Sequence, residues 1–139
     1  MSKQTTYVPY GAALLRITLG LILLAHALLK LLVFTLPGTV SFFAGQGFPG
    51  WLAYPVVFVE LVGGAALIVG FEARLVALAV LPVLLGALTV HAGNGWLFTA
   101  PKGGWEYPAL LAVIAVIVAL LGDGALALGS PLTSSRSKA

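Results

Sequence analysis

The chain has 139 residues, of which 60% are hydrophobic and only 8% are charged. Soluble domains are typically about 45–50% apolar and about 25% charged, so this composition excludes an ordinary soluble globular domain. The net charge of +3 is too small to support nucleic-acid binding, and the absence of cysteine excludes disulfides, iron–sulfur clusters and thiolate chemistry within the chain.

Four apolar runs are long enough to cross a lipid bilayer, which takes about 20 helical residues. The runs are unbroken rather than alternating, and a helix satisfies its own backbone hydrogen bonds in lipid. The sequence therefore predicts an all-α fold, an integral membrane four-helix bundle forming a single domain over residues 1–129, followed by a flexible polar tail over residues 130–139. The predicted spans are residues 10–34, 51–70, 74–93 and 106–128.

The first span carries three basic side chains on one helical face. At 3.6 residues per turn, Arg16, His26 and Lys30 fall within an arc of about 80°. The apolar run is too long for a typical cleavable signal peptide, so we expect the span to remain in the mature chain.

The second span places a carboxylate, Glu60, near the middle of the bilayer. An ionisable group at that depth costs at least a few kcal/mol, so it normally faces the bundle interior and has a partner. We predict a buried ion pair between Arg16 and Glu60, with His26 or His91 as alternative partners. The glycines that follow, Gly63 and Gly64, would let another helix approach closely.

The third span follows a short turn over residues 71–74, in which Glu72 is expected to be solvated. It ends near His91, and the fourth span opens at Glu106 after a loop rich in glycine and aromatic residues. Pro82 has no backbone N–H and would weaken the helix locally within the third span.

An even number of spans puts both termini on one side of the membrane. The excess of lysine and arginine there, at Lys3, Arg74, Arg136 and Lys138, predicts cytoplasmic N and C termini. Residues 35–50 and 94–105 then form outward-facing loops. The expected location is the inner (plasma) membrane, with the chain crossing it several times.

This topology places the remaining polar side chains at related depths near the outer surface. We expect them to converge on one outward-facing pocket. The glycine-rich loops and Trp105 would cover its outer opening, and Glu60 would lie at its inner end. The candidate ligand-binding or proton-relay residues are His26, Lys30, Glu60, His91, Trp105 and Glu106. No histidine or carboxylate motif with tight metal-ligand spacing is present, so no metal site is predicted.

Several short segments stand in a fixed order along the chain: LLRITLGLILLAHALLK, GFPGW, ELVGGAALIVG, GGWEYPALL and LLGDGALAL. In this order they resemble the DoxX family of small four-helix membrane proteins, which includes DoxD-like subunits. The resemblance covers roughly residues 11–128 and implies a four-helix membrane bundle. Such relatives are associated with thiosulfate:quinone oxidoreductase, with thiol-redox and oxidative-stress complexes, and with the assembly of membrane partners.

Two functions from different classes fit these features. The first is a subunit of a quinone-linked redox complex, in which histidine and lysine donate hydrogen bonds to quinone carbonyls and the carboxylates relay protons. It would need a redox protein partner, because nothing in the chain carries electrons, and no covalent cofactor is expected. The second is a non-catalytic membrane scaffold or assembly factor. Transport or sensing of a lipophilic phenol is a third possibility, and homo-oligomerisation is compatible with each.

Overall fold

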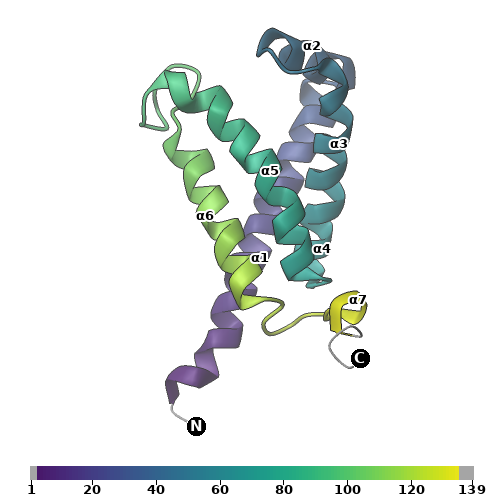
Figure 1. The fold of residues 1–139 in the computed structure, drawn as a ribbon, viewed down its shortest axis with the longest axis vertical. Helices are drawn as coiled ribbons and strands as arrows, with labels where there is room; N and C mark the ends of the chain where they lie inside the picture. Colours follow the sequence, from purple (N-terminus) through teal and green to yellow (C-terminus); the bar gives the residue numbers. More distant parts are fainter. Residues whose placement is uncertain (1–2, 135–139) are drawn as a thin grey trace.

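The computed structural model describes residues 3–134, and every regular element in that range is helical (Figure 1). No strand forms among these residues; one isolated parallel bridge joins Phe71 and Gly129. The start of α1 and the short helix α7 lie at one end of the molecule, which we call the α7 end. Helix α2 and the connection between α5 and α6 lie at the opposite end, which we call the α2 end.

The first rod is helix α1, Lys3–Leu28, which continues into a π-helical turn, η1, Leu29–Val33. It is rich in leucine and alanine, which are strong helix formers. The rod begins earlier than the predicted start at residue 10, and its segment Thr6–Val33 is long and apolar enough to span a bilayer.

The connection after η1, predicted as a loop over residues 35–50, contains a helix, α2, Leu36–Gly45. Thr35 caps its N-terminus by accepting a hydrogen bond from the Gly38 backbone N–H at 3.3 Å. Thr39, buried one turn later, donates its hydroxyl toward the carbonyls of Thr35 and Lys30. These contacts hold α2 against the end of the first rod, and the loop prediction is therefore wrong for most of this segment.

The second rod is built from four short helical pieces that together form one apolar span, Gly50–Val69. Its π-helical turn lies at the middle and contains Glu60. The pieces are η2, Gly50–Leu52; α3, Ala53–Phe58; η3, Val59–Gly63; and α4, Gly64–Val69.

The first and second rods touch through two glycines. A Cβ added to Gly20 would lie 2.7 Å from the Gly64 carbonyl oxygen, and one added to Gly64 would lie 2.9 Å from the Gly20 carbonyl oxygen. Side chains at these positions would therefore push the two backbones apart. This contact fixes the register of the two antiparallel rods, with residue 20 opposite residue 64.

The third and fourth rods form a hairpin. Helix α5, Ala73–His91, continues into a 3-10 turn, η4, Ala92–Asn94, and helix α6 runs over Glu106–Leu121. The predicted fourth span reaches residue 128, but α6 ends at Leu121 because Gly122 adopts a positive φ of 83°. Three described helices are thus long enough to span a membrane, and α6 is a shorter fourth apolar helix.

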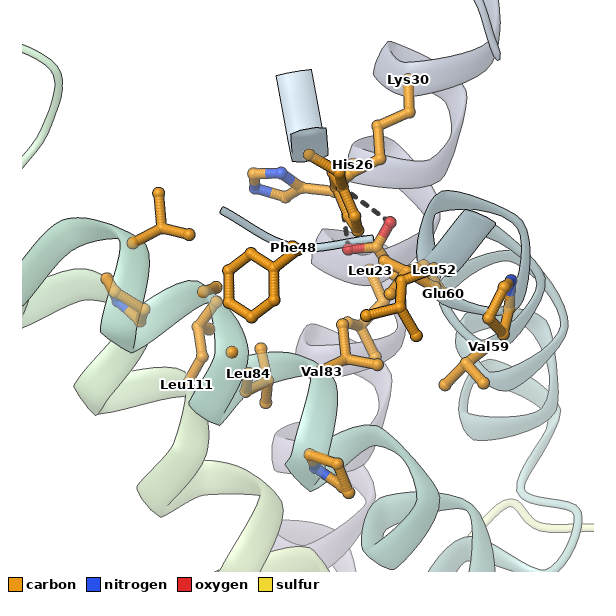
Figure 2. Close-up of a pocket in the computed structure, with 18 of the residues that line it drawn as sticks. Leu23, His26, Lys30, Phe48, Leu52, Val59, Glu60, Val83, Leu84 and Leu111 are labelled. Atoms are coloured by element: carbon orange, nitrogen blue, oxygen red, sulfur yellow. Dashed lines mark hydrogen bonds and ion pairs between the residues drawn. The ribbon is translucent and has the colours of Figure 1, made fainter. Parts of the chain in front are cut away.

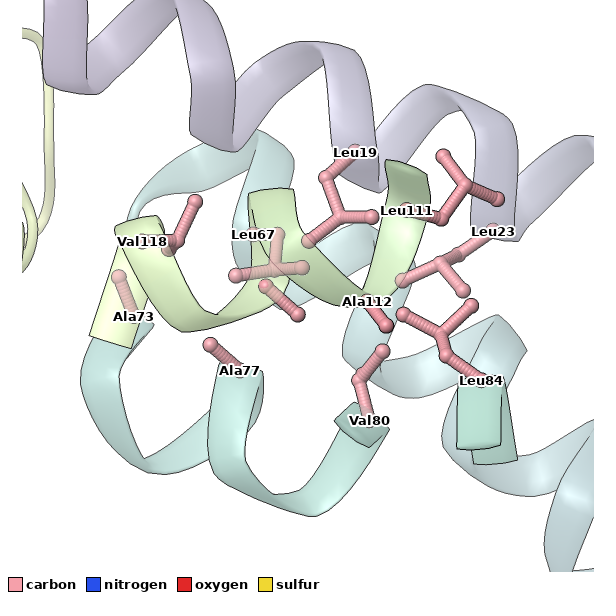
Figure 3. Packing of buried hydrophobic residues seen from close by; sticks show 11 residues of the cluster. Leu19, Leu23, Leu67, Ala73, Ala77, Val80, Leu84, Leu111, Ala112 and Val118 are labelled. Carbon is pink, nitrogen blue, oxygen red and sulfur yellow. The ribbon is translucent and has the colours of Figure 1, made fainter. Parts of the chain in front are cut away.

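The hydrophobic core lies where α1, α4, α5 and α6 meet, toward the α7 end (Figure 3). Small side chains such as Ala73, Ala77 and Ala115 let α5 and α6 pack closely, and leucines from α1 and α4 fill the centre. The α2 end lacks an equivalent core, because the α5–α6 hairpin diverges there from α1 and α3 (Figure 1).

The segment after α6 folds back beneath α4 and ends in helix α7, Pro131–Ser134. Glu72 is 1% exposed rather than solvated as predicted: its carboxylate accepts hydrogen bonds from the Leu132 and Thr133 backbone N–H groups and from the Thr133 hydroxyl. The predicted flexible tail is therefore partly helical, and residues 135–139 lie outside the described residues.

Candidate functional site

A cavity of about 510 Å³ lies at the α2 end, between the first two rods and the α5–α6 hairpin. Most of its wall is apolar, supplied by residues such as Leu23, Val83 and Leu111 (Figure 2). Four of the predicted site residues line it: His26, Lys30, Glu60 and His91. The structure thus brings most of the predicted site together.

The strongest electrostatic feature of the cavity is an ion pair between Lys30 and Glu60 (Figure 2). The Lys30 ammonium lies 3.0 Å from Glu60 Oε1 and 2.9 Å from Oε2, and the side chains are 17% and 8% exposed. Each residue belongs to a π-helical turn, η1 or η3. Such turns shift the direction of the side chains that follow them and are frequent at functional sites.

The predicted ion pair between Arg16 and Glu60 is wrong. With Gly20 opposite Gly64 in antiparallel rods, Glu60 lies at the level of residue 24 and Arg16 at the level of residue 68. Eight residues, about 12 Å of helix, therefore separate Arg16 from the level of Glu60. Lys30 is only six residues away from the level of Glu60. Its long, flexible side chain spans the remaining distance to the carboxylate.

Arg16 instead joins separate chain segments at the α7 end of the bundle. It is fully buried and donates all five of its N–H groups to backbone carbonyls. Two of the acceptors, the carbonyls of Leu67 and Ile68, lie in the last turn of α4, where carbonyls lack the regular helical hydrogen bond from four residues further along. The other three acceptors are the carbonyls of Asp123, Ala125 and Leu126. Arg16 therefore ties the segment after α6 to α4 and does not contribute to the cavity.

His26 lies on the cavity wall one turn before Lys30 on the first rod. Its ring centroid is 6.4 Å from that of Tyr107, which also lines the cavity. Within the part of the chain that the structure describes, neither ring nitrogen of His26 has a hydrogen-bond partner. The imidazole is therefore free to donate to, or accept from, a ligand in the cavity.

His91 lies on the opposite wall, at the end of α5. Its Nδ1 is 3.0 Å from the Gly103 carbonyl oxygen, which also accepts a hydrogen bond from the Asn94 side chain. His91 and Tyr107 also line a second cavity of about 260 Å³ beneath the loop that precedes α6. The His91 ring thus lies at a wall that the two cavities share.

Trp105 and Glu106 do not line the main cavity, contrary to the prediction. Trp105 is 42% exposed, and the Glu106 carboxylate accepts a hydrogen bond from the Phe98 backbone N–H at 3.2 Å. The backbone N–H groups of both residues are bonded to the carbonyls of Gly95 and Trp96. These contacts tie the start of α6 to the loop that precedes it.

The cavity has aromatic covering residues that the sequence prediction missed. Phe42 and Phe43 come from α2, and Phe48 follows it. The rings of Phe42 and Phe43, and those of Phe43 and Phe48, form adjacent pairs with centroids 6.4 Å apart. A threonine followed by a proline two positions later is a helix-start signal that could have revealed α2.

Fold and site together define a multi-pass membrane protein with a mostly apolar cavity that contains an ion pair and two histidines. Residues 11–92, which reach from α1 to the end of α5, match the DoxX family. The chain belongs to the DoxX family.

One curated relative is a protein of Bacillus subtilis (strain 168) named "Putative oxidoreductase CatD". It is 33% identical over 119 residues, which cover 85% of this chain and 84% of the relative. No solved structure matches the chain.

Proposed function

We propose that this protein is the membrane subunit of a quinone-linked redox system and that its cavity binds the headgroup of a quinone or a similar lipophilic ligand. The proposal rests on four polar side chains in an otherwise mostly apolar cavity of about 510 Å³: His26, Lys30, Glu60 and His91. Ligand sites typically combine a mostly apolar lining with a few convergent polar groups.

The chemistry of these groups suits a quinone. The aromatic side chains of Phe42, Phe43 and Phe48 offer surfaces against which a planar ring can pack. Lys30 has a third N–H beyond the two directed at Glu60, and His26 has two free nitrogens, so both can bond a ligand oxygen. Family membership and the relative named as an oxidoreductase support the redox setting. The electrons would come from a partner protein, because the chain has no cysteine with which to carry them itself.

Replacing His26 with phenylalanine should weaken quinone binding about two- to tenfold, because it removes one hydrogen bond while keeping a ring beside Tyr107. Isothermal titration calorimetry with tetramethyl-1,4-benzoquinone, on the protein in lipid nanodiscs, measures the affinity. Glu106→Gln is the matched control, because Glu106 lies outside the cavity, and it should bind as the unaltered protein does.

Absence of saturable binding by the unaltered, folded protein would overturn the ligand proposal and leave the scaffold function in its place. Purification in mild detergent together with a stoichiometric protein partner, but without quinone, would be the direct sign of that alternative.

We also propose that both termini face the cytoplasm and that the α2 end faces outward in the plasma membrane. The support is the basic bias of the terminal side, where Arg74 lies, although Arg136 and Lys138 fall outside the described residues. Single cysteines introduced at Ser41 and Thr99 should react with a membrane-impermeant thiol reagent applied from outside, and one at Ser2 should not. The reverse labelling pattern would refute this orientation.

A further inference from the structure

We propose that the cavity selects the hydroxyl form of its ligand, a hydroquinone or another phenol, over the quinone form, and that His91 makes this distinction. The inference rests on the proposed function and specifies the chemical state of the ligand that the site prefers.

The contact with Gly103 fixes the proton position on His91. A carbonyl oxygen can only accept a hydrogen bond, so His91 Nδ1 must carry the proton in the 3.0 Å contact with Gly103. In the neutral ring Nε2 then has no proton and can only accept. Within residues 3–134, Nε2 has no hydrogen-bond partner. His91 thus presents an acceptor at the cavity wall.

The contacts that hold this ring orientation come from the loop. A Cβ on Gly103 would approach His91 Cε1 and Nδ1 to 3.4 Å, so the backbone of the loop lies directly against that edge of the ring. The same Gly103 carbonyl is held by the Asn94 side chain at 2.9 Å. The tautomer is therefore set by backbone geometry and does not depend on the ligand.

The opposite wall is less selective. Glu60 accepts hydrogen bonds, Lys30 donates them, and the two lie within 3.0 Å of each other. A ligand carbonyl can accept there from Lys30, and a ligand hydroxyl can either accept from Lys30 or donate to Glu60. This wall can therefore satisfy both forms of the ligand.

The His91 wall cannot satisfy both. A hydroxyl donates to the bare Nε2, whereas a quinone carbonyl would place two acceptors together with no proton between them. Leaving both acceptors unsatisfied away from water costs affinity for the quinone only. We expect the hydroquinone to bind about tenfold more tightly than the quinone.

Three ligands with one ring skeleton test this preference: tetramethylhydroquinone, tetramethyl-1,4-benzoquinone and 1,4-dimethoxytetramethylbenzene. Their four methyl groups block addition of lysine to the ring. Calorimetry is done without oxygen at pH 8, where imidazole side chains are ordinarily neutral. The unaltered protein should bind the hydroquinone about tenfold more tightly than either of the others. Neither the quinone nor the dimethoxy compound has a hydroxyl proton to donate to His91 Nε2.

The variant His91→Phe should lose the preference while still binding the quinone. His26→Phe is the matched control: it removes the other imidazole of the cavity and should weaken both forms without changing their ratio. Equal affinity for the three ligands in the unaltered protein would overturn the inference while leaving the ligand site intact, and so would a preference that persists in His91→Phe. Binding of none of them would instead overturn the proposed function. If His91→Phe does not fold, equal binding of the hydroquinone and the dimethoxy compound by the unaltered protein would still overturn the inference.

Discussion

Replacing Arg16 with lysine is expected to lower the free energy of unfolding by about 3–5 kcal/mol. The guanidinium donates five hydrogen bonds to five carbonyls, and a lysine ammonium has only three N–H groups on a single atom. Hydrogen bonds to charged groups contribute about 1.5–3 kcal/mol each, and the abandoned carbonyls would remain buried.

Denaturant titration in mixed micelles, followed by circular dichroism, measures this loss. Arg74→Lys is the matched control, because Arg74 is an exposed arginine at the same end of the molecule, and it should change stability by less than about 0.5 kcal/mol. Equal stability of the Arg16→Lys and Arg74→Lys proteins would contradict the structural role assigned to Arg16.

The second large effect is expected at the ion pair in the cavity. Glu60→Gln leaves Lys30 without its counter-charge and Lys30→Met leaves Glu60 without its own, so each single change should cost about 3–5 kcal/mol. The double variant removes both charges and should be markedly more stable than the sum of the single losses predicts.

The same unfolding measurement on the four proteins gives the coupling energy between Lys30 and Glu60. Glu106→Gln provides the reference for a carboxylate outside the cavity and should be nearly neutral. If the losses at Lys30 and Glu60 simply add in the double variant, the two side chains do not interact and the cavity wall is organised differently.

The membrane spans and most of the polar cavity residues can be predicted from the sequence alone. Glu60 is costly in lipid, so its need for a partner follows from its place in an apolar run. The identity of that partner does not, because the choice between Arg16 and Lys30 depends on the register of the first two rods. The register comes from the contact between Gly20 and Gly64, and nothing in the sequence pairs these two glycines.

The errors at the helix ends have a related cause. Glu72 is expected in a solvated turn because the residues beside it in the sequence form a short connection, yet its hydrogen-bond donors, Leu132 and Thr133, lie 60 and 61 residues away. Likewise, Glu106 opens the fourth rod as predicted, but the loop holds both Glu106 and Trp105 away from the cavity that they were predicted to line. Depth follows from counting residues, whereas facing direction depends on tertiary contacts.

The arrangement separates stability from binding along the length of the bundle. Arg16, Glu72 and the hydrophobic core gather at the α7 end, where the chain segments are tied together. The α2 end has the cavity, the two π-helical turns and the aromatic covering residues. A ligand site near one membrane surface would thus be supported by tightly packed, hydrogen-bonded structure near the other.

Photoaffinity labelling tests most directly whether the cavity at the α2 end binds a lipophilic quinone-type ligand. An azido-quinone is activated by light in membranes containing the protein, and the labelled peptides are identified by mass spectrometry with and without excess unlabelled quinone. We expect labelling that excess quinone suppresses on the segments that line the cavity, around His26, Glu60 and His91. Labelling that excess quinone does not reduce, or that is confined to exposed side chains of α6 such as Leu110 and Leu120, would contradict it.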